Sequence, residues 1–310
     1  MARSSSPAAV MLPKGSERSL ALNLLVSLRP SQWAKNLLVF AGVLFGLRLF
    51  DVTAVAHATA AFGIFCLLSG VVYLINDIAD RDTDRKHPLK ARRPIASGAL
   101  PVRAALTSAI VLGICALAGA FALGLSFFVV AVSYLALLAL YSGPLKHIVI
   151  IDVLTIAIGF VLRAVAGAVA VEVNISQWLL VCTILLALFI SLAKRRHELV
   201  LLARGAASHR PILGEYSPYL LDQMIAVVTA STLIAYVFYT ISPETEQKFG
   251  TPWLGLTIPF PLYGIFRYLY LVHQREGGGS PADLLLTDRP LLLCVTLWAV
   301  SVALIIYQPL

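Results

Sequence analysis

A cluster of acidic residues offers the clearest chemistry in this chain. Residues 76–84 read Asn-Asp-Ile-Ala-Asp-Arg-Asp-Thr-Asp, directly after a stretch, residues 52–76, that carries no charge. If one helix continues through both segments, Asp77, Asp80 and Asp84 share a helical face, with Asn76 at its edge. Carboxylate and amide oxygens are the ligands that Mg²⁺ prefers in proteins. The spacing therefore predicts a magnesium site formed by these four residues. The alternative is a solvated loop in which neighbouring Arg and Lys residues neutralise the acids.

A basic segment that contains Lys90, Arg92 and Arg93 follows the acidic cluster. A metal ion neutralises only part of a diphosphate, and Lys or Arg takes the remaining charge. Together the two segments predict a site for a phosphorylated substrate. The alternative is the ordinary enrichment of Lys and Arg in cytoplasmic loops of membrane proteins.

Two more charged residues interrupt an apolar stretch, residues 148–171. In a helix Asp152 and Arg163 would face the same way, within about 20° and about 16 Å apart along the axis. An intramembrane Arg is costly unless it is paired or lines a wet cavity. We expect both to face a central cavity, and the alternative is a structural pair with some other polar residue. Tyr141 and Lys146, just before this stretch, could donate to a phosphate.

The composition indicates what holds these residues in place. Of 310 residues, 59% are hydrophobic and only 13% are charged. Soluble domains are nearer 25% charged, and a membrane-spanning helix needs ~20 mostly apolar residues, so a soluble enzyme is excluded. The fold class predicted is an all-α polytopic membrane protein. The expected spans, nine in all, are roughly residues 37–51, 53–76, 104–123, 126–143, 148–171, 177–193, 223–243, 252–270 and 290–308. We expect residues 1–20 to be a flexible cytoplasmic tail and residues 21–310 to be one transmembrane domain.

The distribution of Lys and Arg predicts the orientation. One set of connections holds 21 of them, and the opposite set holds two, Arg48 and Lys248. Because Lys and Arg collect on the cytoplasmic side, the N-terminus and the acidic cluster are predicted to be cytoplasmic, in a multi-pass protein of the inner cell membrane. This bias also explains the net charge of +8, so no nucleic-acid partner is expected.

The motifs resemble those of the UbiA superfamily of intramembrane prenyltransferases. The resemblance rests on Asn-Asp-x-x-Asp-x-x-x-Asp at residues 76–84, on His-Pro-x-Lys-x-x-Arg-Pro-Ile-Ala-Ser-Gly at residues 87–98, and on Tyr-Ser-Gly-Pro-Leu-Lys at residues 141–146. With Asp152, Arg163 and the number of spans, it covers nearly the whole chain from Arg29 onward. The resemblance implies a nine-helix bundle with a cytoplasmic-side active site, where the first motif holds Mg²⁺ and a diphosphate.

One segment departs from that family pattern. Where typical members carry a second acidic motif, this chain has Lys194, Arg195, Arg196, His197 and Glu198. Three consecutive cations would hold a second Mg²⁺ poorly and would attract a bare phosphate. A ligand with one diphosphate and one separate monophosphate fits, as phosphoribosyl pyrophosphate does. Together with the entry sequence at residues 28–40, Leu-Arg-Pro-Ser-Gln-Trp-Ala-Lys-Asn-Leu-Leu-Val-Phe, this segment resembles the branch of the superfamily that transfers 5-phosphoribose to decaprenyl phosphate for cell-wall arabinan.

This resemblance implies a Mg²⁺-dependent phosphoribosyltransferase whose substrates are phosphoribosyl pyrophosphate and a polyprenyl phosphate lipid, and it leaves room for a homo-oligomer such as a trimer. Asp77, Asp80 and Asp84 would hold the metal at the diphosphate. Lys35, Lys146 and Arg163 are candidates for orienting the lipid phosphate or the diphosphate. Lys194, Arg195 and Arg196, with Arg92 and Arg93, are candidates for the 5-phosphate. The alternatives are an aromatic prenyltransferase with a prenyl diphosphate donor and, from another class, a transporter.

Overall fold

The computed structural model describes residues 19–86, 90–202, 211–274, 284 and 287–307, and every element within them is helical. The α-helices are α1 (Leu20–Ser27), α2 (Ala41–Phe45), α3 (Val52–Ala79), α4 (Arg81–Lys86), α5 (Pro94–Ser97), α6 (Val102–Ala122), α7 (Leu125–Ser142), α8 (Ile151–Ala170), α9 (Gln177–Leu202), α11 (Pro218–Ile241), α12 (Pro243–Phe249), α13 (Pro259–Gln274) and α15 (Arg289–Ile306). The 3₁₀ helices are η1 (Pro30–Phe40), η2 (Lys90–Arg92), η3 (Leu145–His147), η5 (Pro211–Glu215) and η6 (Trp253–Thr257). The expected tail, residues 1–20, lies almost wholly outside the described residues.

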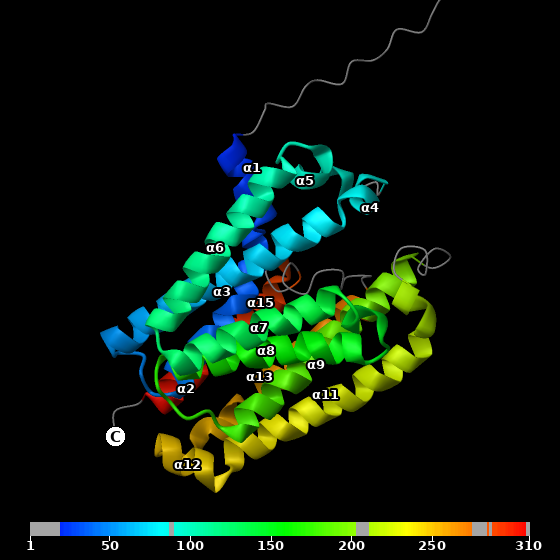
Figure 1. Ribbon diagram of the computed structural model, residues 1–310. Helices are drawn as coiled ribbons and strands as arrows, with labels where there is room; N and C mark the ends of the chain where they lie inside the picture. Colours follow the sequence, from blue (N-terminus) through cyan, green and yellow to red (C-terminus); the bar gives the residue numbers. More distant parts are fainter. Residues whose placement is uncertain (1–18, 87–89, 203–210, 275–283, 285–286, 308–310) are drawn as a thin grey trace, which may run out of the picture.

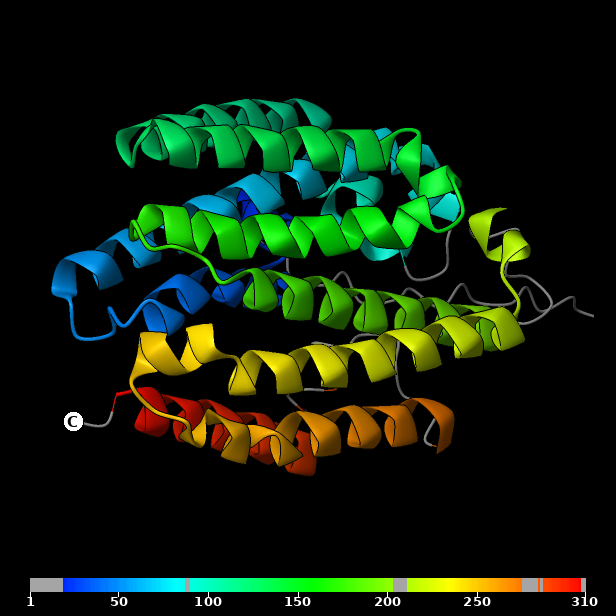
Figure 2. The same cartoon turned by 90° about the horizontal axis from the view of Figure 1, so that it is seen from below.

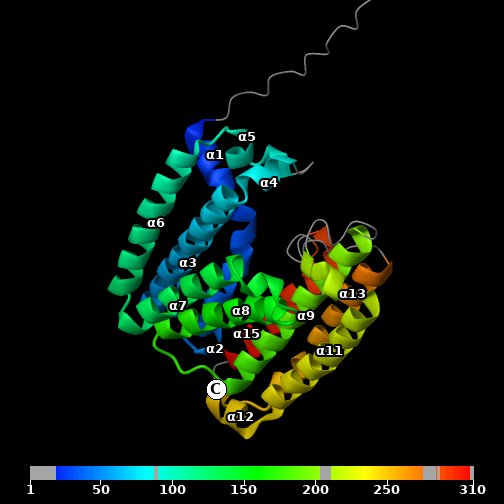
Figure 3. The ribbon, with the colours of Figure 1, turned by 45° about the vertical axis from the view of Figure 1, so that its right-hand side comes forward.

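The long helices run side by side as one bundle (Figures 1 and 2). The short elements α4 and α5 lie at one end, which we call the motif end because α3 brings the acidic cluster there (Figure 3). The short helices α2 and α12 lie at the opposite end. The all-helical class predicted from composition is therefore confirmed.

Within the described residues, seven helices are long and apolar enough to cross a membrane: α3, α6, α7, α8, α9, α11 and α15. The two other expected spans correspond to η1 with α2, which begins at Pro30 rather than at residue 37, and to α13, which has 16 residues. The expected count of nine spans therefore stays a prediction. The expected break near Gly124 is confirmed, because α6 ends at Ala122 and α7 begins at Leu125.

Helix α8 lies at the centre of the packing. Through Val153 its N-terminal part belongs to a hydrophobic cluster with residues of α9, α11, α13 and α15. Through Ala166 and Ala170 its C-terminal part belongs to a second cluster with residues of α3, α6 and α7. Of its apolar window, 56% is buried, the largest share among the seven candidate spans. Asp152 and Arg163 both belong to α8, so both lie inside the protein.

A close backbone crossing fixes the first span against α8. A Cβ atom on Gly167 would lie 1.9 Å from the carbonyl oxygen of Val39, and one on Gly42 would lie 2.6 Å from the carbonyl carbon of Gly167. Only glycine permits this approach, as is usual where helices meet within a membrane. The crossing holds η1 against the C-terminal half of α8, where Asn36 Oδ1 accepts from Arg163 Nε.

Candidate active site

The acidic cluster contains a buried pair of carboxylates. The side chains of Asp77 and Asp84 are only 3% and 2% exposed. Arg93 Nη1 donates to both of them, at 3.0 Å to Asp77 Oδ1 and 2.7 Å to Asp84 Oδ2. The two carboxylate oxygens therefore lie close enough to face a single cation.

The other two residues of the predicted magnesium site are placed differently. Helix α3 ends at Ala79, and Asp80 is an exposed C-cap rather than part of one continuous helix. Asn76 is half-buried. Over the described ranges, no three Asp, Glu, His or Cys side chains form a metal-sized cluster. The shared helical face that the spacing predicted is therefore broken at Asp80, and the structure brings together two of the three carboxylates.

Arg29 is a part of this site that the sequence analysis did not single out. Its Nη2 atom donates to Asp77 Oδ1 at 2.6 Å, and its guanidinium lies 4.6 Å from the centre of the Tyr73 ring. Arg29 connects α1 to η1 in a left-handed backbone conformation with φ of 54°. The signal in the sequence was its place in the entry segment, residues 28–40, directly before Pro30.

Of the other predicted basic residues, Lys90 lies beside the acidic pair. Lys90 Nζ is 4.0 Å from Asp84 Oδ1. Arg92 is exposed and Lys146 is half-buried on η3, and neither has a hydrogen bond or ion pair to the part of the chain that the structure describes. Lys35 is half-buried on η1. Arg92 and Lys146 thus differ from Arg29 and Arg93, which are already bonded to carboxylates.

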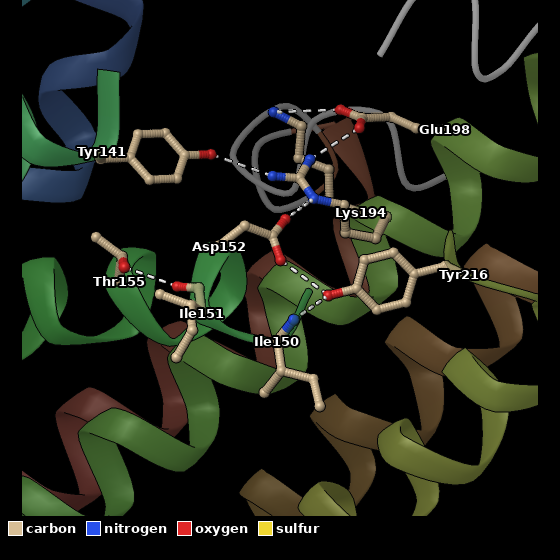
Figure 4. A network of polar contacts seen from close by, with 9 residues as sticks. Tyr141, Ile150, Ile151, Asp152, Thr155, Lys194, Glu198 and Tyr216 are labelled. Carbon is tan, nitrogen blue, oxygen red and sulfur yellow. Dashed lines mark hydrogen bonds and ion pairs between the residues drawn. The ribbon is translucent and has the colours of Figure 1, made fainter. Parts of the chain in front are cut away.

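A second polar network joins α7, α8 and α9 (Figure 4). Asp152 is fully buried, and its Oδ2 atom accepts from Arg195 Nε at 2.9 Å. Arg195 also donates to Glu198 Oε2 at 2.8 Å and to the Tyr141 hydroxyl at 3.2 Å. Each nitrogen of the Arg195 guanidinium thus has a protein partner, and its side chain is only 2% exposed. The geometry gives Arg195 an internal role in place of the phosphate contact that the sequence suggested.

Tyr216 completes this network, and the sequence analysis had not identified it. Its hydroxyl donates to Asp152 Oδ1 at 2.8 Å and accepts from the backbone N–H of Ile150 at 2.8 Å. Burial raises the pKa of Tyr216 to about 12, so the hydroxyl stays protonated and keeps donating at neutral pH. Asp152 is therefore satisfied on both oxygens.

The neighbours of Arg195 point elsewhere. Lys194 lies 3.9 Å from Glu198 and is 43% exposed. Arg196 pairs with Asp222 on α11, which also lies 3.3 Å from His273 Nε2. The three consecutive cations do not converge, and Lys194 is the one with the most exposed side chain.

Arg163 forms a third buried network, separate from Asp152. Its donors reach Asn36 Oδ1 at 2.7 Å, the carbonyl oxygen of Gly159 at 2.8 Å and the Tyr134 hydroxyl at 2.7 Å. These partners are all neutral, and they come from η1, α7 and α8 itself. Asp152 and Arg163 thus share α8 but face different partners. Neither of them is among the described residues that line the apolar cavity between α2, α9, α11, α13 and α15.

This apolar cavity has a volume of about 380 Å³ and lies among α2, α9, α11, α13 and α15. Its lining is almost wholly apolar and includes Phe45, Phe189, Tyr239, Tyr268 and Trp298. The Tyr268 hydroxyl is buried without a hydrogen-bond partner among the described residues. A cavity of this volume falls within the ~300–1,000 Å³ usual for small-molecule sites.

The donor set at the motif end suits a divalent cation. Asp77 and Asp84 are buried carboxylates that converge on one cationic nitrogen, and a cation of higher charge could replace it. Both are hard oxygen ligands of the kind that Mg²⁺ takes, with substrate phosphates and water completing its shell. The residues present therefore fit a Mg²⁺ ion bound together with a phosphate ligand.

Fold and site together define a class of intramembrane enzyme. The sequence profile of the UbiA prenyltransferase family matches residues 36–281, and the chain belongs to this family. It is a multi-pass membrane protein.

Two named relatives are similar to this chain over most of its length. A decaprenyl-phosphate phosphoribosyltransferase of Mycobacterium tuberculosis (strain ATCC 25618 / H37Rv) is 34% identical over 291 residues, which cover 92% of this chain and 94% of the relative. One from Corynebacterium glutamicum is 32% identical over 301 residues, covering 94% of this chain and 88% of the relative. Among solved structures, a UbiA homolog from Archaeoglobus fulgidus bound to GPP and Mg²⁺ has a TM-score of 0.70 at 22% identity, covering 93% of this chain and 99% of that one. The last similarity concerns the fold alone.

Proposed function

We propose that the protein transfers 5-phosphoribose from phosphoribosyl pyrophosphate to a polyprenyl phosphate such as decaprenyl phosphate, and releases diphosphate. The observation that carries this proposal is the similarity to decaprenyl-phosphate phosphoribosyltransferases along almost the whole chain, at 34% identity. The site is consistent with it, because Arg195 and Lys194 already pair with Asp152 and Glu198, which leaves the buried pair Asp77 and Asp84 for a metal-bound diphosphate.

The residues at the motif end would divide the work of binding the donor. Asp77 and Asp84, with Asn76 and Asp80 beside them, would hold Mg²⁺, which supplies positive charge to the leaving diphosphate. Arg93 and Lys90 would neutralise the part of the diphosphate charge that the metal does not neutralise. Lys194, Lys146 and Arg92 would receive the 5-phosphate, because Arg195 is sealed inside the protein.

The reaction itself asks little acid–base chemistry of the protein. An oxygen of the lipid phosphate attacks C1 of the ribose, the C1–O bond to diphosphate breaks, and diphosphate leaves with the electron pair. The sugar gains positive charge as this bond breaks, and fixed charges around the site stabilise the separation. Lys35, half-buried on η1, would orient the lipid phosphate.

The apolar cavity would accommodate part of the polyprenyl chain. It is lined mainly by aromatic and aliphatic side chains from six helices, η1 included. Phe189, one of these lining residues, lies on α9, the helix that also carries Arg195. A long isoprenoid would leave the cavity between helices and continue in the bilayer. We place the phosphate ends of both substrates on the cytoplasmic side of the membrane.

A comparison of donor substrates tests this proposal. Purified protein in detergent, with Mg²⁺ and decaprenyl phosphate, should transfer label from phosphoribosyl pyrophosphate. Asp77→Asn should lower this turnover to background while the protein still inserts and elutes as wild type, because the buried acidic pair is lost. Transfer from a labelled prenyl diphosphate to an aromatic acceptor, with none from the phosphorylated sugar, would replace the proposal with an aromatic prenyltransferase.

A further inference from the structure

We infer that Arg29 and Arg93 are exchangeable counter-ions of the acidic pair. In the metal-free protein they neutralise Asp77 and Asp84. When Mg²⁺ and a diphosphate bind together, the carboxylates turn to the metal and the two guanidiniums turn to the diphosphate. This inference rests on the proposed function, since it takes a diphosphate as the ligand, and it explains how the same site handles metal and anion.

The positions of the four side chains support the exchange. The carboxylates are 3% and 2% exposed, whereas the Arg29 and Arg93 side chains are 29% and 28% exposed. The acids therefore lie beneath the guanidiniums, on the protein side. Arg29 and Arg93 both donate to Asp77 Oδ1, so a cation that binds this oxygen must take the place of a guanidinium.

The charges explain why metal and diphosphate should bind together. Two carboxylates, two guanidiniums and the Lys90 ammonium group, 4.0 Å from Asp84, sum to +1, so the closed cluster offers little attraction to Mg²⁺ alone. A diphosphate alone would need guanidiniums that are already bonded to the acids. When both arrive, every group gains a partner of opposite charge, and no carboxylate is left buried and unpaired, which would be strongly unfavourable.

Arg29 has the contacts that such a movement requires. Its guanidinium packs over the Tyr73 ring at 4.6 Å, and this contact does not involve Asp77. A guanidinium stacked on an aromatic face can exchange one anionic partner for another without becoming unpaired. Tyr73 thus provides a fixed surface on which Arg29 can turn.

Calorimetric titration of the purified full-length protein tests the exchange without sugar or lipid. Mg²⁺ is titrated alone and then with inorganic diphosphate at fixed free concentrations. We expect diphosphate to tighten Mg²⁺ binding to the wild type by about 5–150-fold, the usual range for coupled sites. In Arg29→Gln, Mg²⁺ alone should bind about tenfold more tightly than to wild type, and the effect of diphosphate should fall by a similar factor.

Arg48→Gln is the matched control. Arg48 forms the corresponding ion pair with Asp51 at the other end of α3, at 2.9 Å, and its loss should leave both titrations unchanged. Because Mg²⁺ and diphosphate also associate in solution, the comparison is between proteins under identical conditions.

Two results would overturn the inference. One is an Arg29→Gln protein that binds Mg²⁺ alone no better than wild type, which would make Arg29 a structural residue only. The other needs no variant and covers the case in which Arg29→Gln does not fold: wild type that binds Mg²⁺ equally well with and without diphosphate. Neither result depends on phosphoribosyl transfer, so a failure here and a failure of the donor assay can be told apart.

Discussion

At the scale of single residues, the loss of Arg195 should strongly destabilise the folded protein, because Arg195 forms a buried ion pair with Asp152. Arg195 and Asp152 are 2% and 0% exposed, and removal of one member of such a buried pair typically costs about 3–5 kcal/mol. We therefore expect Arg195→Met to lower the free energy of unfolding by about that amount, since the buried Asp152 carboxylate would lose its guanidinium partner. Denaturant titration in detergent measures it.

Two further variants give this prediction its controls. Arg195→Met combined with Asp152→Asn should recover part of the loss, because no unpaired buried charge remains. Arg196→Met, one residue along α9, should cost only about 0–1 kcal/mol, because its partner Asp222 is 36% exposed. Equal losses for Arg195→Met and Arg196→Met would contradict the internal role of Arg195.

The sequence indicated which residues belong to the site, but it did not indicate which residues they bond to. Residue spacing placed Asp77 and Asp84 on one site, and the structure does bring them together through Arg93. It could not pair Arg195 with Asp152 or Arg29 with Asp77, because those residues are 43 and 48 positions apart along the chain. Such contacts depend on how helices pack, and helical periodicity carries no information about that.

At the scale of elements, the glycine crossing of η1 with α8 should be intolerant of any side chain. A Cβ on Gly167 would lie 1.9 Å from the Val39 carbonyl oxygen, so the backbones must separate. We expect Gly167→Ala to destabilise the protein by about 1–3 kcal/mol or more, as overpacking of a close contact does. A lower midpoint of thermal unfolding in detergent would show it.

Gly63→Ala is the natural comparison for that variant. It changes the same residue type within α3, where an added Cβ meets nothing within 4 Å. Alanine is the better helix former by roughly 0.5–1 kcal/mol, so the midpoint should rise slightly or stay the same. If both variants melted alike, the close approach of the two backbones would be excluded as a source of stability.

The helices themselves were largely predictable because long apolar stretches without charge have few other structures available in a membrane. The less regular elements were not. Helix α3 ends at Ala79, where the acidic pattern suggested continuation, and the first span begins with the eleven-residue 3₁₀ helix η1. Both departures lie where the chain approaches Arg29 and Asp77, so the local geometry follows tertiary contacts rather than propensity.

At the scale of the whole molecule, the two ends of the bundle differ in charge. The motif end carries the acidic cluster and the basic segment after it, whereas Arg48 and Lys248 lie near the opposite end, beside α3's start and on α12. An enzyme that uses a phosphorylated sugar from the cytoplasm needs the motif end on that side, and the excess of Lys and Arg there favours the same orientation. The position of the site and the charge bias of the loops therefore both predict that the motif end faces the cytoplasm.

Cysteine labelling in oriented vesicles tests this predicted orientation. Asp82→Cys places a thiol at the motif end, where the Asp82 side chain is 88% exposed, and Gln247→Cys places one on α12. A membrane-impermeant maleimide should label Gln247→Cys in right-side-out vesicles and Asp82→Cys in inside-out vesicles, with labelling of wild type as the background from its four native cysteines. The reverse pattern would put the acidic pair outside the cell, where it could not meet a cytoplasmic sugar diphosphate, and would contradict both the orientation and the proposed donor.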